Sequence, residues 1–325
     1  MANENKLEVG QSRVGLMIDG LPETPRVSVK LERTEDRVEV TIPFLDGIGD
    51  VFQYWFSDGI MFGDDPERKN RRYSPPPTVS FYDAHGSVGL VGSRVTGSKL
   101  RFGGVGGVGE GRLAFDFTVL GASSGTAYER VNGLRSEVEG LGTWIGLRSL
   151  SAEQRIEAGR LASVNLRLES PKTIRAARRL NTEFQANWRY GPGPAPDQTT
   201  ISERMHIRTQ VKRAVSWEEH LRIHFALRNL LRVTAWRPLN FASHEVMSDA
   251  DPVRTADGAA HGSQWLPVIT HRTGVPTGAA TKLSSWDLLF TFGDVRSRGV
   301  SRCLDASERF ERGLTPLVGL LDLKG

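Results

Sequence analysis

Short stretches in which apolar and polar residues alternate, separated by glycine-rich or charged turns, fill most of the first half of the chain. Alternation with a period of two puts the apolar side chains on one face of an extended strand, which buries that face and leaves the other in water. The alternating stretches are 26–33, 37–43, 78–84, 87–93 and 112–120. Because the turns between them are short, they predict a mainly antiparallel β-structure over residues 12–150.

The second half mixes strand patterns with less regular segments. Residues 151–155 favour a short break or helical turn, and 172–185 favour a helix with a thin apolar face. Prolines and glycines predict a flexible segment at 190–200, because they disfavour both helix and ladder. The segments expected to form strands are 163–170, 201–213, 239–246, 265–270 and 286–292.

Two helices stand out from this strand-rich pattern. Residues 216–236 begin with Ser216 and Glu219 at the spacing of a capping box and continue with apolar residues every three or four positions. Pro238 follows and ends that helix. Residues 299–323 predict a C-terminal helix bent near Pro316.

Together these elements predict an α+β, β-rich fold. It would be built from antiparallel sheets in a sandwich-like or barrel-like arrangement, with one long helix embedded near 216–236 and a helix at the C-terminus. The expected organisation is an N-terminal tail, two β-rich subdomains and a C-terminal helix. Their bounds are 1–11, 12–150, 151–298 and 299–325.

Composition excludes several classes of protein. Of the 325 residues, 38% are hydrophobic and 25% charged, which is typical of a soluble globular chain, and the net charge of +4 is too small to assign a nucleic-acid partner. We find neither a secretory signal nor a window apolar enough to span a membrane. The single cysteine, Cys303, excludes an intrachain disulfide and a four-thiolate zinc site. These features predict a cytoplasmic protein.

A G-x-G-x-x-G pattern at Gly104, Gly106 and Gly109 raises the question of a nucleotide site. That motif binds pyrophosphate only where a strand turns directly into a helix N-terminus. Here the glycines lead into 112–120, which has the alternation of a strand. We therefore interpret the glycines as a hairpin turn, and we expect no cofactor.

His220 and His224 are the weak candidates for a metal site. Four residues apart on the predicted helix, they project from one face, as metal ligands can. A zinc protease would carry glutamate directly after the first histidine, where this chain has Leu221. We interpret both as partly exposed residues of a packed helix and predict no metal.

Residues 64–77 contain the strongest local concentration of positive charge. Basic side chains neutralise phosphates and an adjacent aromatic ring can stack on a base, so this loop is a candidate for nucleic-acid or ligand contact. A solvated connecting loop is the alternative. The candidate residues are Arg68, Lys69, Arg71, Arg72 and Tyr73.

No catalytic set emerges from the sequence. Aspartates of the first half occupy turn-like segments, which collect such residues for turn chemistry. There is no G-x-S-x-G, and Cys303 lies in a predicted helix without a nearby histidine. We therefore favour a non-enzymatic role for this chain and assign no catalytic residue.

Three stretches together carry a resemblance to a known family. They are FYDAHGSVGLVGS at 81–93, RVNGLRSEVEGLGTWIGLRSLS at 130–151 with Leu141 and Trp144, and HLRIHFALRNLLRVTAWRPLNFASHEV at 220–246. Their order, a strand pair, an apolar segment around a tryptophan, and a leucine-rich helix followed by Arg-Pro and a strand, resembles the N-terminal domain of ApeA-type abortive-infection proteins. The similarity spans most of residues 80–312.

The resemblance implies a β-rich domain that precedes a helical HEPN ribonuclease domain in a bacterial anti-phage system. It implies a sensing or regulatory role, with a phage-derived trigger and a HEPN ribonuclease, in cis or in trans, as partners; RNA contact and a homo-oligomer stay open. The C-terminal helix would lead into the HEPN region, with Leu314, Leu317, Leu320 and Leu321 as its partner-facing residues. Arg213 with His220, and Arg254 with His261, have the outer spacing of the HEPN signature but not its context, so no catalytic role is carried over.

Two alternatives come from other classes. A β-sandwich that binds carbohydrate could use tryptophans as stacking platforms, although most lie in apolar segments where burial is expected. These are Trp55, Trp144, Trp188, Trp236, Trp265 and Trp286. A glycoside hydrolase would need two carboxylates facing across a cleft, which no sequence pattern here indicates.

Overall fold

The computed structural model packs into two compact units, each of which is described by itself. The first contains Met1–Val131 and Glu245–Gly274, and the second contains Asn132–His244 and Val275–Gly325. The residues that the structure describes are 5–21, 24, 26–45, 51–56, 74–101, 107–193, 195, 197–255, 257–273, 283–310, 312, 316 and 318–321.

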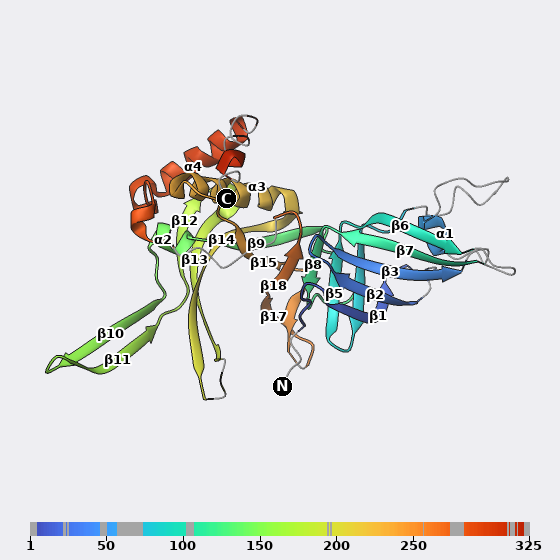
Figure 1. Ribbon diagram of the computed structural model, residues 1–325, viewed down its shortest axis with the longest axis horizontal. Coiled ribbons are helices and arrows are strands. Elements are labelled where there is room, and N and C mark those ends of the chain that lie inside the picture. The colour runs from blue at the N-terminus through green and yellow to red at the C-terminus, as the bar shows by residue number, and fades with distance from the viewer. Residues whose placement is uncertain are drawn as a thin grey trace. The chain divides into compact units, whose positions relative to one another are not determined.

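The first unit is built on an antiparallel sheet with the strand order β18-β8-β5-β4-β1-β2-β3-β7-β6 (Figure 1). Every pairing along this order is antiparallel. A short helix, α1 (Val51–Phe56), and a small ribbon of β16 (Pro252–Arg254) and β17 (Ala260–Ser263) complete the unit. The strands are β1 (Ser12–Ile18), β2 (Ser28–Arg33), β3 (Val38–Leu45), β4 (Thr78–Asp83), β5 (Gly86–Val91), β6 (Arg94–Arg101), β7 (Val108–Phe115), β8 (Phe117–Leu120) and β18 (Leu266–Thr270).

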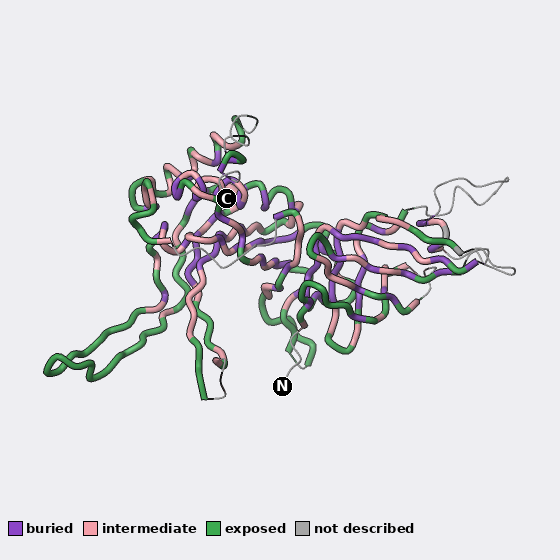
Figure 2. Tube along the Cα trace, in the orientation of Figure 1, coloured by how far each residue is buried: buried purple, intermediate pink, exposed green. Residues whose placement is uncertain are grey.

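The alternation in the sequence places the core of this unit on one face of its strands. In β3, Val38, Val40, Ile42 and Phe44 are buried while the residues between them are partly or fully exposed. A similar division follows β1, β2 and the first part of β7, whereas all four residues of β8 and the last four of β5 are buried (Figure 2). Alternating burial is what an antiparallel sheet with one solvated face produces.

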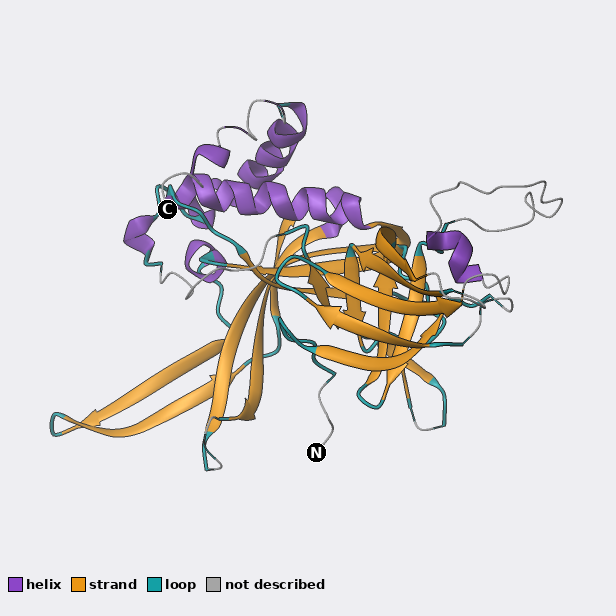
Figure 3. Cartoon of the chain, turned by 45° about the vertical axis from the view of Figure 1, so that its right-hand side comes forward, coloured by secondary structure: helices purple, strands orange, loops and turns teal. Residues whose placement is uncertain are grey.

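The second unit has the strand order β12-β13-β14-β9-β15. Its strands are β9 (Arg130–Val138), β12 (Lys172–Ala177), β13 (Thr182–Pro192), β14 (Thr199–Ser216) and β15 (Phe241–Met247), and β10 (Leu150–Glu157) and β11 (Arg160–Leu168) form a separate two-stranded sheet. Its helices are α2 (Leu141–Ile145), α3 (Trp217–Ala235) and α4 (Phe292–Arg309), with short 3-10 turns η2 (Arg179–Asn181) and η3 (Ser285–Asp287). The helices α3 and α4 lie together over the strands β12 and β14 (Figures 1 and 3).

The long helix forms as its sequence predicts. Ser216 accepts a hydrogen bond from the Glu219 amide, and the Glu219 side chain bonds back to the Ser216 amide, so the capping box is present. At the other end Trp236 adopts a left-handed conformation with φ of 51°, which ends the helix just before Pro238. The helix buries one stripe of side chains against the sheet, among them Ile223 and Leu227.

Several sequence predictions are confirmed by this architecture. The fold is α+β and β-rich, the hairpins at 26–43 and 78–93 form as β2–β3 and β4–β5, and β14 covers the long strand expected at 201–213. Strands also form within 239–246 and 265–270. The strand order of the described sheets is open, so the barrel-like alternative does not occur as a closed barrel.

Four local predictions are wrong. Residues 190–200, expected to be flexible, include the paired ends of β13 and β14, where 190–192 lie opposite 199–201. Residues 151–155 belong to strand β10 instead of a break, and 172–185 form β12, η2 and β13 instead of a helix. There, pairing of β12 with β13 outweighs the helix propensity of alanine and arginine, and positive φ angles at Leu180 and Asn181 make the turn between the strands.

The fourth error concerns residues 286–292, which form η3 and the start of α4 instead of a strand. The missed signal is a second capping box, in which Thr291 bonds to the Asp294 amide and Asp294 bonds back. The C-terminal helix consequently begins at Phe292 and not at 299, and it is interrupted at Arg296, where φ is 50°.

The two compact units differ from the contiguous segments expected from the sequence. Two of the three boundaries between them fall inside β9 and β15, and the third, between 274 and 275, lies outside the described residues. The division into 1–11, 12–150, 151–298 and 299–325 stays a prediction. Among the described residues, no helix has both the length and the apolar character needed to cross a bilayer.

Three aromatic rings from separate elements hold the core of the second unit together. Trp144 of α2, Phe184 of β13 and Phe292 of α4 contact one another edge to face, with centroid distances of 5.8, 5.7 and 5.5 Å. Edge-to-face pairs add to the area that each ring buries. This triangle fixes both helices on the sheet.

The substitution Phe292→Ala is expected to lower the free energy of unfolding by about 3–5 kcal/mol, because it removes a buried ring and two edge-to-face contacts. Urea unfolding of the purified chain measures this change. Phe310→Ala is the matched control, since Phe310 is 56% exposed, and it should alter stability by less than about 0.5 kcal/mol. Equal midpoints for the two variants would contradict the role assigned to the triangle.

Candidate functional site: a polar sheet face and a buried polar chain

One face of the sheet in the second unit carries polar side chains. In the β13–β14 register, Glu183 lies opposite Arg208 and Gln185 lies opposite His206. Cross-strand partners share a face, and so do residues two apart along a strand, so the four side chains lie together. We call these four residues the polar face. The residues between them point to the opposite side, into the hydrophobic core.

Burial without hydrogen bonds distinguishes this face from an ordinary solvated sheet surface. His206 is 3% exposed, and neither of its ring nitrogens has a hydrogen-bond partner in the described part of the chain. The Gln185 Oε1 and Arg208 Nε atoms are also buried, and they too have no hydrogen-bond partner in the described part of the chain. Buried polar atoms in folded proteins nearly always have partners, so these three neighbouring residues have donors and acceptors left over for an ordered water or a ligand.

The electrostatics of the polar face keep the imidazole neutral. Burial, followed by the positive charges of Arg135 and Arg204, lowers the pKa of His206 to about 3. Arg208 forms an ion pair with Glu183, so the charges of that pair balance. A neutral imidazole carries one donor and one acceptor.

A group that both donates and accepts hydrogen bonds would satisfy the unpartnered atoms of the polar face. The polar face offers acceptors at Gln185 Oε1 and one nitrogen of His206, and donors at Arg208 Nε and the other nitrogen. A peptide group or the edge of a nucleobase has this combination, whereas a bare cation or a bare anion does not. No sequence pattern pointed to this site, because Gln185 and His206 meet only through strand pairing.

A second polar cluster lies inside the core of the same unit. Ser136 Oγ lies 2.6 Å from His224 Nδ1 and 2.7 Å from His244 Nδ1. Thr209 Oγ1 lies 2.7 Å from His220 Nδ1 and 2.9 Å from His224 Nε2. The five residues come from β9, β14, α3 and β15, and none is more than 6% exposed. We call them the buried polar chain.

The buried polar chain shows where the two metal candidates lie. His220 and His224 were expected to be partly exposed, but both are fully buried, and both ring nitrogens of His224 contact hydroxyl groups. Among the described residues, no group of three or more histidine, cysteine, aspartate or glutamate side chains is placed to hold a metal ion. Zinc binding at these histidines gains no support from this geometry, and the expectation that they hold no metal stays a prediction.

The contact between Ser136 and His224 has the distance of a nucleophile and its base. Both residues are completely buried, so a substrate cannot reach the serine hydroxyl in this conformation. Satisfied networks of this kind specify how core elements pack together. We therefore assign the buried polar chain a structural role.

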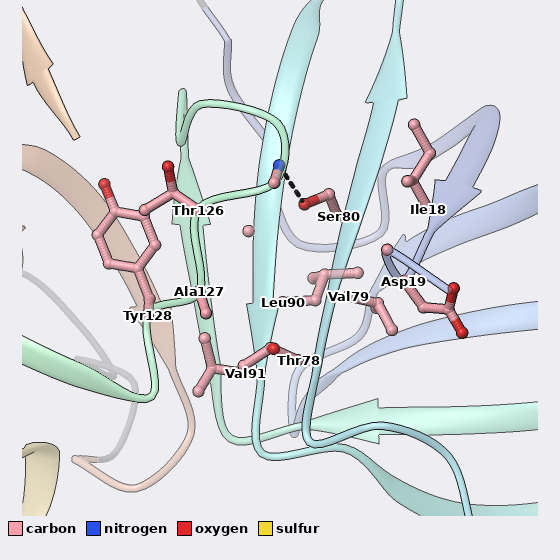
Figure 4. A pocket seen from close by; sticks show the side chains of 13 residues that line it. Ile18, Asp19, Thr78, Val79, Ser80, Leu90, Val91, Thr126, Ala127 and Tyr128 are labelled. Atoms are coloured by element: carbon pink, nitrogen blue, oxygen red, sulfur yellow. Dashed lines mark hydrogen bonds between the residues drawn. The ribbon is translucent and has the colours of Figure 1, made fainter. Parts of the chain in front are cut away.

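A small pocket lies in the first unit between the end of β1, the strands β4 and β5, and the loop 125–128 (Figure 4). Its volume is about 120 Å³. Thr126 and Tyr128 lie on one side of it and Asp19 on the other. The Tyr128 hydroxyl donates to Asp251 at 2.6 Å, and burial followed by this hydrogen bond raises the pKa of Tyr128. The pocket has ordered walls but room only for a small group.

Most of the contact residues predicted from the sequence lie outside the described residues. Arg68, Lys69, Arg71, Arg72 and Tyr73 lie outside the described residues, and so do Leu314 and Leu317. Leu320 is 58% exposed and Leu321 is 5% exposed. Nucleic-acid contact through the basic loop and partner contact through the C-terminal leucines stay predictions.

The glycine pattern at 104–109 is flanked by described strands on both sides. Gly104 and Gly106 lie outside the described residues, whereas Gly109 lies in β7. This strand pairs antiparallel with β6, which precedes the glycines. The described residues on either side of the pattern therefore belong to two paired strands, as the turn interpretation expects, and the turn itself stays a prediction.

The tryptophans are less buried than the sequence suggested. Trp55 and Trp144 lie in the core, but Trp188, Trp236 and Trp286 are 39%, 56% and 92% exposed. Their exposed indoles keep carbohydrate binding as an untested alternative. For a glycoside hydrolase the support is weaker, because the resolved pKa shifts of the described carboxyl groups are all downward, whereas a general acid needs a raised pKa.

Two of these exposed tryptophans belong to one patch near the end of α3. The Leu289 amide donates to the Thr234 carbonyl at 2.9 Å, which holds the segment before α4 against α3. Leu289 is itself 69% exposed, and the same hydrogen bond brings the segment that carries Trp286 to the end of α3, where Trp236 follows Thr234 by two residues. We call Trp236, Trp286 and Leu289 the aromatic patch.

The buried histidines make stability depend on pH. Burial lowers the pKa of His206 to about 3 and that of His244 to about 4, whereas the unfolded chain binds a proton near pH 6.5. Stability is therefore full above pH 6.5 and is lost as the pH falls towards 4, by about 2 kcal/mol per buried histidine between pH 7 and pH 5. Urea unfolding at a series of pH values measures this slope.

In the His206→Gln variant, the free energy of unfolding should fall by about 2 kcal/mol less between pH 7 and pH 5 than in the unmodified chain, because one titrating group is removed from the unfolded chain. Substitution of His261, which lies in β17, is the control for a histidine that is exposed and not buried. A His206→Gln variant with the pH dependence of the unmodified chain would show that His206 is not held neutral.

Comparison with known proteins identifies the family. A family model described as ApeA N-terminal domain 1 matches residues 22–299, which is most of the chain. No curated protein and no solved structure matches it. The β-rich architecture and the expected resemblance agree with this match. The chain therefore belongs to the ApeA N-terminal domain 1 family, which implies a role in an anti-phage abortive-infection system.

Proposed function

We propose that this chain is the recognition and control part of its abortive-infection system. It binds a phage-derived trigger in the bacterial cytoplasm and controls a HEPN ribonuclease that is carried in the same polypeptide or in a second one. Family membership supports a role in an abortive-infection system. Two surfaces of the second unit support separate sites for the trigger and for the ribonuclease. The polar face would receive the trigger, and the aromatic patch would contact the ribonuclease.

The observation that carries the recognition step is the set of buried, unpartnered atoms on the polar face. Leaving a buried donor or acceptor unsatisfied costs about 1–3 kcal/mol. Such a cost at His206, Gln185 and Arg208 is recovered when the side chains that cover these atoms move aside and a ligand supplies the missing partners. A trigger that presents a peptide group or another mixed donor and acceptor would therefore bind with a favourable change in hydrogen bonding.

The observation that supports the control step is the exposure of the aromatic patch. Tryptophan is enriched among the residues that contribute most to protein interfaces, and exposed apolar patches mark interaction sites. The patch includes the segment directly before α4, near the C-terminal part of the chain. An ion pair of 3.3 Å between Arg237 and Asp287 borders it and would form part of a polar rim.

A phage-plating experiment tests recognition. The complete system, with its HEPN ribonuclease, is expressed in bacteria that are then challenged with a panel of phages. His206→Ala is expected to reduce protection by at least tenfold in plating efficiency, because it removes the central partner of the trigger. Thr173→Ala is the matched control, since Thr173 lies opposite Gln185 on the same face but is exposed.

The Thr173→Ala control should protect the bacteria as well as the unmodified system does. Thermal unfolding of both variants shows whether the His206 substitution acts through the fold. Full protection by a folded His206→Ala variant would contradict a role of the polar face in recognition.

A co-purification experiment tests control of the ribonuclease. The chain and the HEPN module are produced as separate polypeptides, and the fraction of module retained is measured. The double substitution Trp286→Ala with Leu289→Ala should reduce retention at least tenfold, because it removes the exposed centre of the aromatic patch. Trp188→Ala removes another exposed indole outside the patch and should not change retention; equal retention for both would contradict this assignment.

A further inference from the structure

A two-stranded arm extends from the second unit with almost all of its surface in solvent. It consists of β10 and β11, joined by a two-residue turn in which Ala158 and Gly159 have φ of 47° and 75°, as a type I′ hairpin requires. The strands stand away from the other elements of this unit and are coloured as exposed along their length (Figures 1 and 2). We call residues 150–168 the arm.

The base of the arm is firmly attached. The Glu169 amide donates to the Ser149 carbonyl at 2.9 Å, and the Leu150 amide donates to the Glu203 carboxylate at 3.1 Å. Trp188 adds a hydrogen bond from its indole to the Glu169 carbonyl at 2.8 Å. The arm is therefore an ordered extension of the sheet at its base.

The register of the arm separates its side chains into two very different faces. One face consists of the pairs Ser151–Arg167, Glu153–Asn165, Arg155–Ser163 and Glu157–Arg160. A bulge beyond Arg155 keeps the other face in phase, and it consists of the pairs Leu150–Leu168, Ala152–Leu166, Gln154–Val164 and Ile156–Leu161. We call the second set the apolar arm face. It contains no charged residue.

Exposure of this face is unusual for a soluble chain. Its exposed fractions are 64% for Ile156, 59% for Leu161, 53% for Leu166, 44% for Val164 and 36% for Leu168. These side chains together expose roughly 450 Å² of apolar surface, as much as the largest patch of a typical monomer. An isolated two-stranded ribbon is at best marginally stable in water, so this face needs a covering layer.

We propose that the apolar arm face packs against the same face of a second copy of this chain. The two arms would form a two-layer, four-stranded sandwich across a twofold axis, with their charged faces pointing outwards into water. This proposal does not depend on the proposed recognition of a trigger.

The chemistry of the face favours its own copy as the partner. An uncharged surface offers no charge complementarity to a charged partner, and an identical surface matches it without burying an unpaired ion. Its single polar side chain is Gln154, whose amide has both donors and acceptors and can bond reciprocally to the same amide across a twofold axis. With the axis at Gln154, the small Ala152 of one copy faces the larger Ile156 of the other.

The charged faces of the two arms do not oppose this arrangement. The ion pair of 2.7 Å between Arg155 and Glu157 lies on the outward face and stays hydrated. Burial of both apolar arm faces would remove about 900 Å² in total, which is below the standard size of a stable interface. We therefore expect a reversible dimer whose population depends on concentration.

Sedimentation velocity of the full chain over the micromolar range tests the proposal. The unmodified chain is expected to shift from monomer to dimer as its concentration rises. Leu166→Arg places a charge on the apolar arm face and should raise the dissociation constant at least tenfold. Asn165→Arg introduces the same residue at the neighbouring position on the charged face, and it should leave the dissociation constant unchanged.

Cysteine cross-linking tests the geometry. In a Cys303→Ser background, which removes the only native cysteine, Gln154→Cys should form a disulfide-linked dimer under mild oxidation, because it lies at the axis. Ser163→Cys on the opposite face should not. A chain that stays monomeric throughout, or a dimer that Leu166→Arg leaves intact, would overturn the proposal. A monomer whose retention of the HEPN module depends on Leu166 would also overturn it and would assign the arm to that module.

Discussion

Strands β13 and β14 pair without interruption from Glu183 opposite Arg208 to Pro192 opposite Thr199, and this register determines the chemistry on both sides of the second unit. On one side it aligns the side chains that close the core beneath α3 and α4. On the other it brings the polar face together, and further along the same hairpin it carries the Trp188 and Glu203 contacts that hold the arm. A slip of one residue would exchange the two faces and place His206 in the core.

Local signals account for the parts of the fold that could be predicted. Alternation over β2, β3, β4 and β5, and the capping box of α3, are properties of a few adjacent residues and need no tertiary information. The segment 172–185 could not be predicted in this way. Its alanine and arginine content favours a helix, but pairing with a distant strand and the turn at Leu180 and Asn181 decide the outcome.

The candidate site was harder to predict from the sequence, because it too depends on contacts between residues that are distant along the chain. Spacing correctly put His220 and His224 on one face of a helix, but their burial depends on Ser136 and Thr209, which come from two other strands. His206 lies in a strand with the ordinary alternation of a surface position, and nothing in its neighbours along the chain indicates burial. What could be predicted from composition and resemblance was the class of protein, and the family match agrees with it.

Two of the three boundaries between the compact units lie within β9 and β15, so the polypeptide crosses from one unit to the other twice in mid-strand. Recombination that joined one unit to a foreign neighbour would have to cut a ladder and leave its amides and carbonyls without partners. The units are therefore expected to be inherited as a single block in evolution, and diversification should concentrate in the arm and in surface turns, where insertions leave both sheets whole.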